Sequence, residues 1–541
     1  MFATHRNLTA GFRSQRSMAM GRGGMVCTSQ TLASTAGLEI LRTGGNAIDA
    51  AVAAAAVLGV VEPFSTGIGG DCFALVWSAR DRRLYGINGS GRAPAGLSCE
   101  LLEQRGLASM PAHGMLPVTI PGAVDAWSEL LARFGRRALG EVLQPAIDYA
   151  AHGFPVTEII QHQWQLIVRF GVLQHPDAVR TLTRNGEPPG LGEVFRLPEL
   201  AESMRRIATG GRDVFYCGEI AEKIVAFAAA NGGVHQRADF ATHRSQWVDP
   251  ISTDYRGYQV CEIPPNGQGL AALMALNILE SFAPEELGSP ASLHLRIEAV
   301  KLAYADRGRY IADPDFENVP VDSLLDKRYA AEQANRIDRR RAMADADPGE
   351  PAKGTDTVYL ATADAEGNLV SFINSLYLPF GSGMVAGDTG IILHNRGYGF
   401  ATEPGHPNRL APGKRPFHTI IPGMMLKDGR PLLAFGIMGG DVQAQAHVQL
   451  VSNLIDHGFN IQEGLDFPRF NYFEGNRVAF ENDHDPAVLR DLAAMGHEIL
   501  GEEAALLRGS FGGGQGIAIE PGSGVCWGGS DRRKDGVAVG Y

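Results

Sequence analysis

The stretch KGTDTVYLATADAEGNLVSFINSLY (Lys353–Tyr377) decides the fold, because it has the form of a β-hairpin. Two apolar runs, at 357–363 and 369–376, flank a short polar segment with one glycine, a pattern typical of two antiparallel strands and their turn. A three-residue loop from Ala365 to Gly367, with the glycine in the left-handed region, is a common connection. That loop pairs Asp364 with Asn368 and, further along, places Thr357 opposite Ser375.

Two hydroxyl groups therefore face each other at one end of the predicted hairpin. Directly opposed side chains in an antiparallel pair have Cβ atoms about 4.5–5.5 Å apart. Both hairpin faces are apolar, with Tyr359 on one and Val358 on the other, as expected of strands that are covered on both sides. We expect a sheet sandwiched between other layers.

The composition indicates a globular, enzyme-sized protein whose partners are small molecules. The chain has 541 residues, of which 45% are hydrophobic and 20% charged, so it can bury large cores. Its formal net charge of −12 is not offset by a basic block. This charge argues against nucleic acid or an anionic membrane as the main partner.

The cysteine and histidine patterns predict neither disulfide bonds nor a metal centre. The six cysteines are spread singly, so neither a disulfide framework nor a zinc site is predicted. No cluster of His, Asp and Glu ligands stands out, and we expect no metal and no organic cofactor. No secretory signal is seen before Arg22 and no run is long enough to cross a bilayer, so a cytoplasmic location is predicted.

Helical patterns dominate outside the hairpin. Apolar spacing predicts helices at 31–41, ending at a glycine C-cap, and at 47–61. The middle, about 121–312, is expected to be mostly helical, with helices at 123–134, 139–152, 220–230, 270–279 and 293–309. In the last of these, Glu298, Lys301, Asp306 and Arg309 lie at helical spacing and could form an ion-paired face. A solvated or structural face is the favoured interpretation.

Two glycine-rich segments each precede a strand. Thr66–Gly70 leads into an apolar run at 72–77, and 509–516 leads into another at 517–519. A phosphate-binding loop would precede a helix, so a tight turn is favoured over a nucleotide site in both places. A charged, Pro- and Gly-bearing segment at about 336–356 is predicted to be a flexible linker that ends at the hairpin.

The chemistry suggested for Thr357 requires a cut between Asp356 and Thr357. A threonine hydroxyl is a weak nucleophile, and one solution uses the residue's own α-amino group as the base. The reference pKa of an α-amine, about 7.7–8.0, suits that task. The Thr357 hydroxyl would attack the preceding carbonyl, and water would open the resulting ester. Ser375 could hold and polarise the Thr357 oxygen, although a threonine at a strand start is common without any such role.

A family resemblance runs almost from end to end of the chain. It rests on GGNAIDA (44–50), TGIGG (66–70), PGAV (121–124), DYRGY (254–258), EAVK (298–301), YADR (304–307), GSG (381–383), AG (386–387), GG (439–440) and GSDR (529–532). These motifs resemble the gamma-glutamyltransferase (gamma-glutamyltranspeptidase) family of N-terminal nucleophile hydrolases. The resemblance implies an α+β fold, a four-layer αββα sandwich, with a large subunit 1–356 and a small subunit 357–541 that begins with the nucleophile.

The resemblance also assigns catalytic residues. It makes Thr357 the processed nucleophile and puts Ser375 where the family has a supporting threonine. Gly439 and Gly440 match the pair whose backbone N–H groups form the oxyanion hole, and the loss of one such donor costs on the order of 10²–10³ in rate in studied cases. Without the resemblance, these two glycines would suggest a plain turn.

Several positions depart from the family pattern. Ser90 replaces an arginine that grips the glutamyl carboxylate, and Arg92 follows two residues later. Tyr377, Arg396 and Gly399 replace Asn, Gln and Asp, and His418-Thr419 replaces a Ser-Ser pair. Arg92 and Arg396 are candidate carboxylate ligands, although surface arginines are commoner, while Tyr377 and His418 are expected to fill space left by the glutamyl chain. Thr419 belongs to the same predicted substrate site.

Together these features predict an autoprocessed amidohydrolase that acts on a small carboxylate amide resembling oxamate. The alternatives are a glutathione hydrolase or transpeptidase with altered contacts, an acylase for β-lactam side-chain amides, and a non-catalytic scaffold that retains the fold. The predicted partners are the amide substrate and the two subunits of the cleaved chain, without nucleic acid or membrane.

Overall fold

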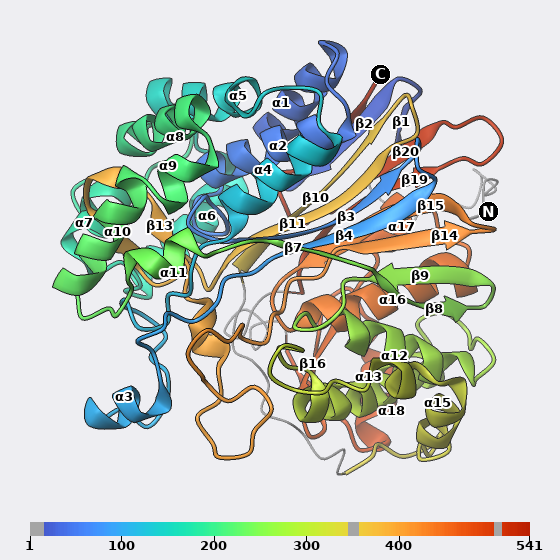
Figure 1. Ribbon diagram of the computed structural model, residues 1–541. Coiled ribbons are helices and arrows are strands. Elements are labelled where there is room, and N and C mark those ends of the chain that lie inside the picture. Colours follow the sequence, from blue (N-terminus) through green and yellow to red (C-terminus); the bar gives the residue numbers. More distant parts are fainter. Residues whose placement is uncertain (1–15, 345–355, 502–510) are drawn as a thin grey trace.

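Two antiparallel sheets form the centre of the molecule in the computed structural model, which describes residues 16–344, 356–501 and 511–541 (Figure 1). The first sheet has the order β21 (Val537–Gly540), β2 (Gly24–Thr28), β10 (Asp356–Asp364), β11 (Leu369–Tyr377), β3 (Asp71–Ser78), β4 (Arg83–Gly89) and β7 (Gln246–Val248). The second has the order β1 (Ala19–Gly21), β20 (Cys526–Ser530), β19 (Gly513–Ile519), β15 (Arg430–Met438), β14 (Gly423–Lys427), β9 (Tyr258–Glu262) and β8 (Ile251–Tyr255).

Helices cover the outer face of each sheet, so the layers run α, β, β, α (Figure 1). On the side of the first sheet lie α1 (Thr31–Arg42), α2 (Ala47–Val61), α4 (Ala123–Phe134), α5 (Leu139–His152), α6 (Glu158–Arg169), α7 (Pro176–Leu182), α8 (Pro198–Gly210), α9 (Arg212–Tyr216), α10 (Glu219–Ala230) and α11 (Arg237–Ala241). On the side of the second lie α12 (Gly269–Glu280), α13 (Pro290–Tyr310), α14 (Val321–Leu325), α15 (Lys327–Ala334), α16 (Val442–Asp456), α17 (Ile461–Asp466) and α18 (Pro486–Ala494). The predicted αββα sandwich is confirmed.

Smaller elements decorate this sandwich. They are α3 (Cys99–Gln104), the pairs β5 (Phe154–Pro155) with β6 (Val194–Phe195) and β12 (Met384–Val385) with β13 (Ile392–Leu393), the sheet of β16 (Phe470–Glu474), β17 (Arg477–Phe480) and β18 (Glu498–Leu500), and the 3-10 turns η2 (Gly387–Thr389) and η3 (Arg396–Gly399). Of these, η3 bears on the site described below.

The hairpin formed by β10 and β11 has the predicted register. Val358 pairs with Asn374 and Ala363 with Leu369, while a bulge interrupts the ladder between Asp356 and Val358. Gly367 in the connecting loop has φ 88°, the left-handed value that a three-residue loop needs. The bulge falls on Thr357, which the sequence pattern did not foresee, and bulges of this kind often re-aim a side chain next to a functional site.

Both faces of the hairpin are buried, as predicted. Tyr359 and Ile373 belong to the core shared with the second sheet, which includes Phe435 of β15. Val358 and Phe372 belong to the other core, beneath α2. A strand that is covered on both faces has no freedom to slip by one residue without exposing an apolar face, so the position of Thr357 is fixed by packing on two sides.

The predicted helices are present with small changes at their ends, and the helical middle also supplies β8 and β9 to the second sheet, which was not predicted. The ion-paired face on α13 is structural at one end, because Glu298 and Lys301 are both fully buried, whereas Arg309 is exposed. All six cysteines are unpaired. Most of the predicted linker, residues 345–355, lies outside the described residues, as do Gly509 and Ser510. Within the described ranges no helix has the length and apolarity to cross a membrane.

Gly436 of β15 should be required for the hairpin to pack against the second sheet. A Cβ placed there would lie 2.3 Å from ring atoms of Tyr359, and forced overpacking of this kind costs about 1–3 kcal/mol. We expect Gly436→Ala to lower the urea midpoint of unfolding accordingly. Gly190→Ala is the matched control, because its new Cβ would meet only Glu193 Oε2, at 3.7 Å. Equal midpoints for both variants would contradict this packing.

Candidate active site

Thr357 and Ser375 meet in the interior, at the bulged end of the hairpin. Thr357 is 2% exposed, and its Oγ1 lies 3.0 Å from Ser375 Oγ. Ser375 Oγ accepts hydrogen bonds from the Tyr377 backbone N–H at 2.9 Å and from Arg396 Nη2 at 3.2 Å. A hydroxyl has two acceptor lone pairs and one proton. Two N–H donors thus point at the oxygen that contacts Thr357 Oγ1, so the Ser375 hydroxyl is held in place beside Thr357.

Arg396 is held in one orientation beneath this pair. It begins η3 and is fully buried, with its Nη1 donating to Thr419 Oγ1 at 2.9 Å. Its guanidinium carbon lies 4.0 Å from the centre of the Tyr377 ring. Burial lowers the pKa of Arg396 to about 10, so it remains a cation at neutral pH and can polarise the hydroxyl of Ser375.

Asp71 supplies the negative charge that accompanies Arg396 into the interior. Asp71 Oδ2 lies 3.8 Å from Arg396 Nε, 2.9 Å from His418 Nε2 and 3.2 Å from His394 Nδ1. Burial alone would raise the pKa of Asp71, but the two histidines hold it well below its usual range. Burial and the nearby Arg396 lower the pKa of His418 to about 3. Asp71 is therefore charged and His418 neutral at pH 7.

The glycine-rich turn before β3 packs directly on the hairpin. A Cβ at Gly70 would lie 2.3 Å from the Ser375 carbonyl oxygen, so no side chain fits there. The Gly70 carbonyl oxygen also accepts the backbone N–H groups of Gly122 and Ala123 at the start of α4. These contacts agree with the tight-turn interpretation of this segment.

Gly439 and Gly440 form a turn at the end of β15 and are linked to the same network. Their φ angles are 124° and 66°, in the region that L-residues rarely adopt. Gln268 joins the turn to Thr419 by donating from its Nε2 to the carbonyl oxygens of Gly440 at 3.0 Å and Thr419 at 2.7 Å. A continuous chain of contacts thus runs from Thr357 to the glycine pair.

A cavity of about 190 Å³ opens beside this network. It is lined in part by Arg307, Tyr398, Gly399, Phe400 and Phe417. Arg307 donates from Nη1 to Gln268 Oε1 at 2.7 Å and to Asp441 Oδ1 at 2.9 Å. The cavity therefore reaches Arg307, which holds the side chain that bonds Gly440.

Tyr377 lies against Arg396 and against Gly399, which lines the cavity. Its hydroxyl lies 3.7 Å from where a Cβ of Gly399 would stand, and that oxygen has no hydrogen-bond partner among the described residues. Burial raises the pKa of Tyr377, so the phenol keeps its proton. The result is a buried O–H donor beside Gly399, a lining position without a side chain.

The structure brings together most of the residues predicted from the sequence. Thr357, Ser375, Tyr377, Arg396, His418 and Thr419 lie in one network, and Gly439 and Gly440 join it through Gln268. Arg92 does not join it, because its guanidinium pairs with Asp313 and Asp315 and donates to the Gly413 carbonyl. Ser90 is buried and donates to Asn88 Oδ1.

Sequence reasoning missed Asp71, His394, Gln268, Arg307 and Asp441. The one local signal was Asp71, an acid at the first position of a strand that is otherwise apolar, since a buried carboxylate needs a partner. Nothing in the sequence pairs it with residues more than three hundred positions away.

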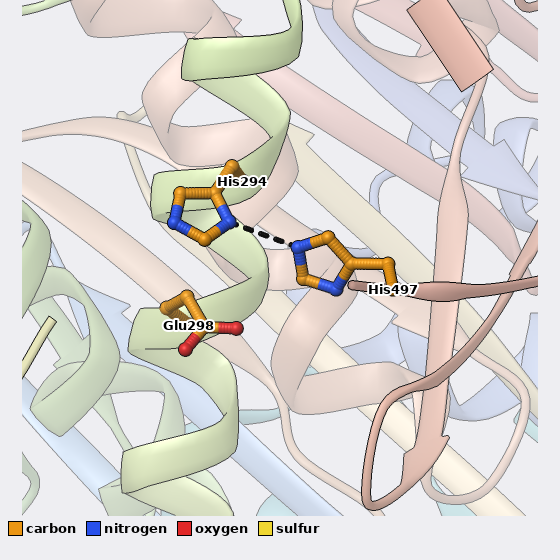
Figure 2. Close-up of side chains that lie close together, drawn as sticks. All are labelled: His294, Glu298 and His497. Atoms are coloured by element: carbon orange, nitrogen blue, oxygen red, sulfur yellow. Dashed lines mark hydrogen bonds between the residues drawn. The ribbon is translucent and has the colours of Figure 1, made fainter. Parts of the chain in front are cut away.

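Residues that could bind a metal also gather in one place, contrary to the expectation of no ligand cluster. His294, Glu298 and His497 lie together, all buried, on the outer side of the second sheet (Figure 2). The second histidine is distant in sequence from the other two residues, so no motif revealed the group. It lies outside the network around Thr357.

Comparisons with known proteins agree with this architecture. The Gamma-glutamyltranspeptidase family profile matches residues 33–541. The chain is 40% identical over 535 residues to the Glutathione hydrolase-like YwrD proenzyme of Bacillus subtilis (strain 168), covering 96% of this chain and 99% of the relative. It is 35% identical to the Oxamate amidohydrolase proenzyme of Klebsiella pneumoniae, covering 96% and 98%.

Among solved structures, the cephalosporin acylase from Bacillus halodurans superimposes with a TM-score of 0.92 at 43% identity, covering 100% of this chain and 99% of that one. Relatives named as hydrolases and as an acylase thus share the whole length of the chain. The protein belongs to the gamma-glutamyltranspeptidase family and is an amide-hydrolysing enzyme of the N-terminal nucleophile type.

Proposed function

We propose that the chain cuts itself between Asp356 and Thr357 and that the new N-terminal threonine then hydrolyses amides. The observation that carries the proposal is the buried Thr357 Oγ1, 3.0 Å from a serine hydroxyl that also accepts hydrogen bonds from the Tyr377 N–H and from Arg396. The products of the cut would be a large subunit 1–356 and a small subunit 357–541. The relatives named as proenzymes support such processing.

In the proposed reaction, Thr357 Oγ1 attacks the amide carbon while the Thr357 α-amine takes its proton. The same amine then delivers that proton to the departing nitrogen, which leaves as ammonia or an amine. Gly439 and Gly440 would stabilise the oxyanion through their backbone N–H groups. Water, deprotonated by the α-amine, resolves the ester to a carboxylic acid and frees Thr357. Ser375 holds the Thr357 oxygen throughout.

We assign Arg396 a positioning role in place of substrate binding. Its two terminal nitrogens donate to Ser375 and Thr419, and its face is covered by Tyr377. A guanidinium that is used in this way has little left to offer a ligand. Arg307, at the edge of the cavity, and the Tyr377 hydroxyl are better placed to meet a substrate carboxylate.

The substrate we propose is an amide whose acyl group carries a carboxylate and no α-ammonium, with oxamate as its simplest example. A γ-glutamyl group would bring an ammonium into the site, and buried charges need partners. The carboxylates of Asp71 and Asp441 each lie beside an arginine, and Gly399 has no side chain. No acid of this network is thus left for an ammonium group.

A second candidate is an acylase that removes larger acyl side chains. The aromatic lining of the cavity, with Tyr398, Phe400 and Phe417, favours it, as does the similarity to the cephalosporin acylase. Neither candidate function requires an acidic residue that binds a substrate ammonium. The two functions differ only in the size of the acyl or amine part that the cavity accepts.

Intact-mass spectrometry tests the cut. We expect the purified protein to show two fragments that meet at Asp356/Thr357, and Thr357→Ala to remain a single chain, because the attacking oxygen is gone. Ser375→Ala serves as the graded variant and should cut more slowly, since Thr357 Oγ1 loses its contact with the Ser375 hydroxyl. An unprocessed wild-type chain, or normal cutting of Thr357→Ala, would contradict the proposal and favour a non-catalytic scaffold.

Two anilides that differ by one amino group test the specificity. Glutaryl anilide has the chain length and carboxylate of γ-glutamyl anilide without its α-ammonium. We expect kcat/KM to be at least about tenfold higher for the glutaryl compound, since an unpaired buried ammonium costs more than 1.4 kcal/mol. Oxamate is assayed beside them by ammonia release. Preference for the γ-glutamyl anilide would favour a glutathione hydrolase with altered contacts.

Replacement of Arg396 tests whether this residue positions Ser375 or binds the substrate. In Arg396→Gln, Ser375 loses a charged hydrogen bond worth about 1.5–3 kcal/mol, so we expect kcat to fall about 10- to 100-fold. KM should change little, because the guanidinium does not touch the substrate. Arg206→Gln, at a half-buried surface arginine paired with Glu202 and Glu219, is the control. A rise in KM at unchanged kcat would instead indicate a substrate-binding arginine.

A further inference from the structure

Two imidazoles and a carboxylate converge in a buried space beside α13 (Figure 2). His294 and Glu298 come from successive turns of α13, and His497 comes from the segment between α18 and β18. His294 and Glu298 are fully buried and His497 is 3% exposed. His294 Nδ1 lies 2.9 Å from His497 Nε2, and one ligand atom from each residue falls within 4.8 Å of the other two.

Hydrogen bonding fixes the tautomer of His294. Its Nε2 lies 2.8 Å from the Asp338 carbonyl oxygen, a contact that requires the proton on Nε2. The lone pair of Nδ1 therefore points into the cluster. Metal-binding histidines usually donate their other ring N–H to a carbonyl or a carboxylate in this way, so His294 already has the orientation of a ligand.

One ring nitrogen of the cluster lacks a hydrogen bond, whereas the carboxylate is paired with a lysine. Among the described residues, His497 Nδ1 is buried without a hydrogen-bond partner. Glu298 Oε1 lies 2.7 Å from the ammonium of Lys301, which itself donates to Asn476 Oδ1 at 2.6 Å. Lys301 thus offsets the carboxylate charge and has a second partner of its own.

We propose that His294 Nδ1, His497 and the Glu298 carboxylate bind a divalent transition metal, with zinc as the best match. Two histidines with one glutamate form a known zinc ligand set, with bonds of about 2.0–2.2 Å. Tetrahedral bonds of that length place two nitrogens about 3.4 Å apart, so the rings would separate by roughly half an ångström as the metal replaces their hydrogen bond. Imidazole ligands disfavour magnesium and calcium.

The site would tie distant parts of the chain together. Met343 N–H donates to Glu298 Oε2 at 3.0 Å and the Asp338 carbonyl accepts from His294, so the described first part of the predicted linker is held at this cluster. His497 lies beyond Thr357 in the sequence. If the proposed cut occurs, the metal would bridge the large and small subunits; metal binding itself does not depend on the cut.

Zinc titration of the EDTA-treated full-length protein tests the site. We expect about one equivalent of zinc to bind, measured by elemental analysis after desalting, and to raise the thermal midpoint, while magnesium does neither. His497→Gln should weaken zinc binding at least about tenfold, because one ligand is lost. His162→Gln, at an exposed histidine, is the control. Equal zinc binding by wild type and His497→Gln would overturn the assignment, as would no retained zinc in the wild type.

Lys301→Met should change the zinc affinity in the opposite direction to His497→Gln. It keeps the proposal testable if His497→Gln fails to fold. The variant removes the ammonium that competes with a cation for Glu298, so zinc should bind more tightly and restore more stability than in the wild type. Weaker zinc binding would contradict the proposal and leave a plain polar network. The same titration on Thr357→Ala separates the two proposals, since an uncut chain should still bind zinc.

Discussion

The contact between Thr357 Oγ1 and Ser375 Oγ is the constraint on which the other features depend. It exists because the hairpin register brings the two residues to the same end of the hairpin, where a bulge falls at Thr357. The register holds because both faces of the hairpin are buried in different cores. Large parts of the chain, far apart in sequence, thus act on the position of one oxygen atom.

Charge balance explains how this contact is supported in the interior. A cation beneath Ser375 raises the polarity of its hydroxyl, but a buried arginine needs an accompanying anion. Asp71 provides it, and the two histidines and the Gly91 N–H surround that carboxylate. Because His418 stays neutral at pH 7, the pair of Asp71 and Arg396 carries no net charge. The departures from the family pattern at 377, 396 and 418 therefore belong to one network.

The hairpin could be predicted from sequence because its signals are local: two apolar runs joined by a three-residue loop that carries a glycine. The family motifs led to Thr357, Ser375 and the glycine pair, and the structure brings these residues into one network. Asp71, His394 and Gln268 could not be found, since their roles arise from contacts between residues that are distant in the chain. Arg92 follows the departure from the family pattern at Ser90. It forms ion pairs with Asp313 and Asp315 and does not join the network around Thr357. His497 was equally hidden, although His294 and Glu298 lie one helical turn apart.

The role of Thr357 as the nucleophile is tested most directly by locating the covalent intermediate. The enzyme is mixed with its best amide substrate, quenched in acid within the first turnovers, digested and analysed by mass spectrometry. We expect an acyl group on the hydroxyl of Thr357 in a peptide that begins with that residue. An acyl group on another side chain, or turnover without any acylated peptide, would contradict it.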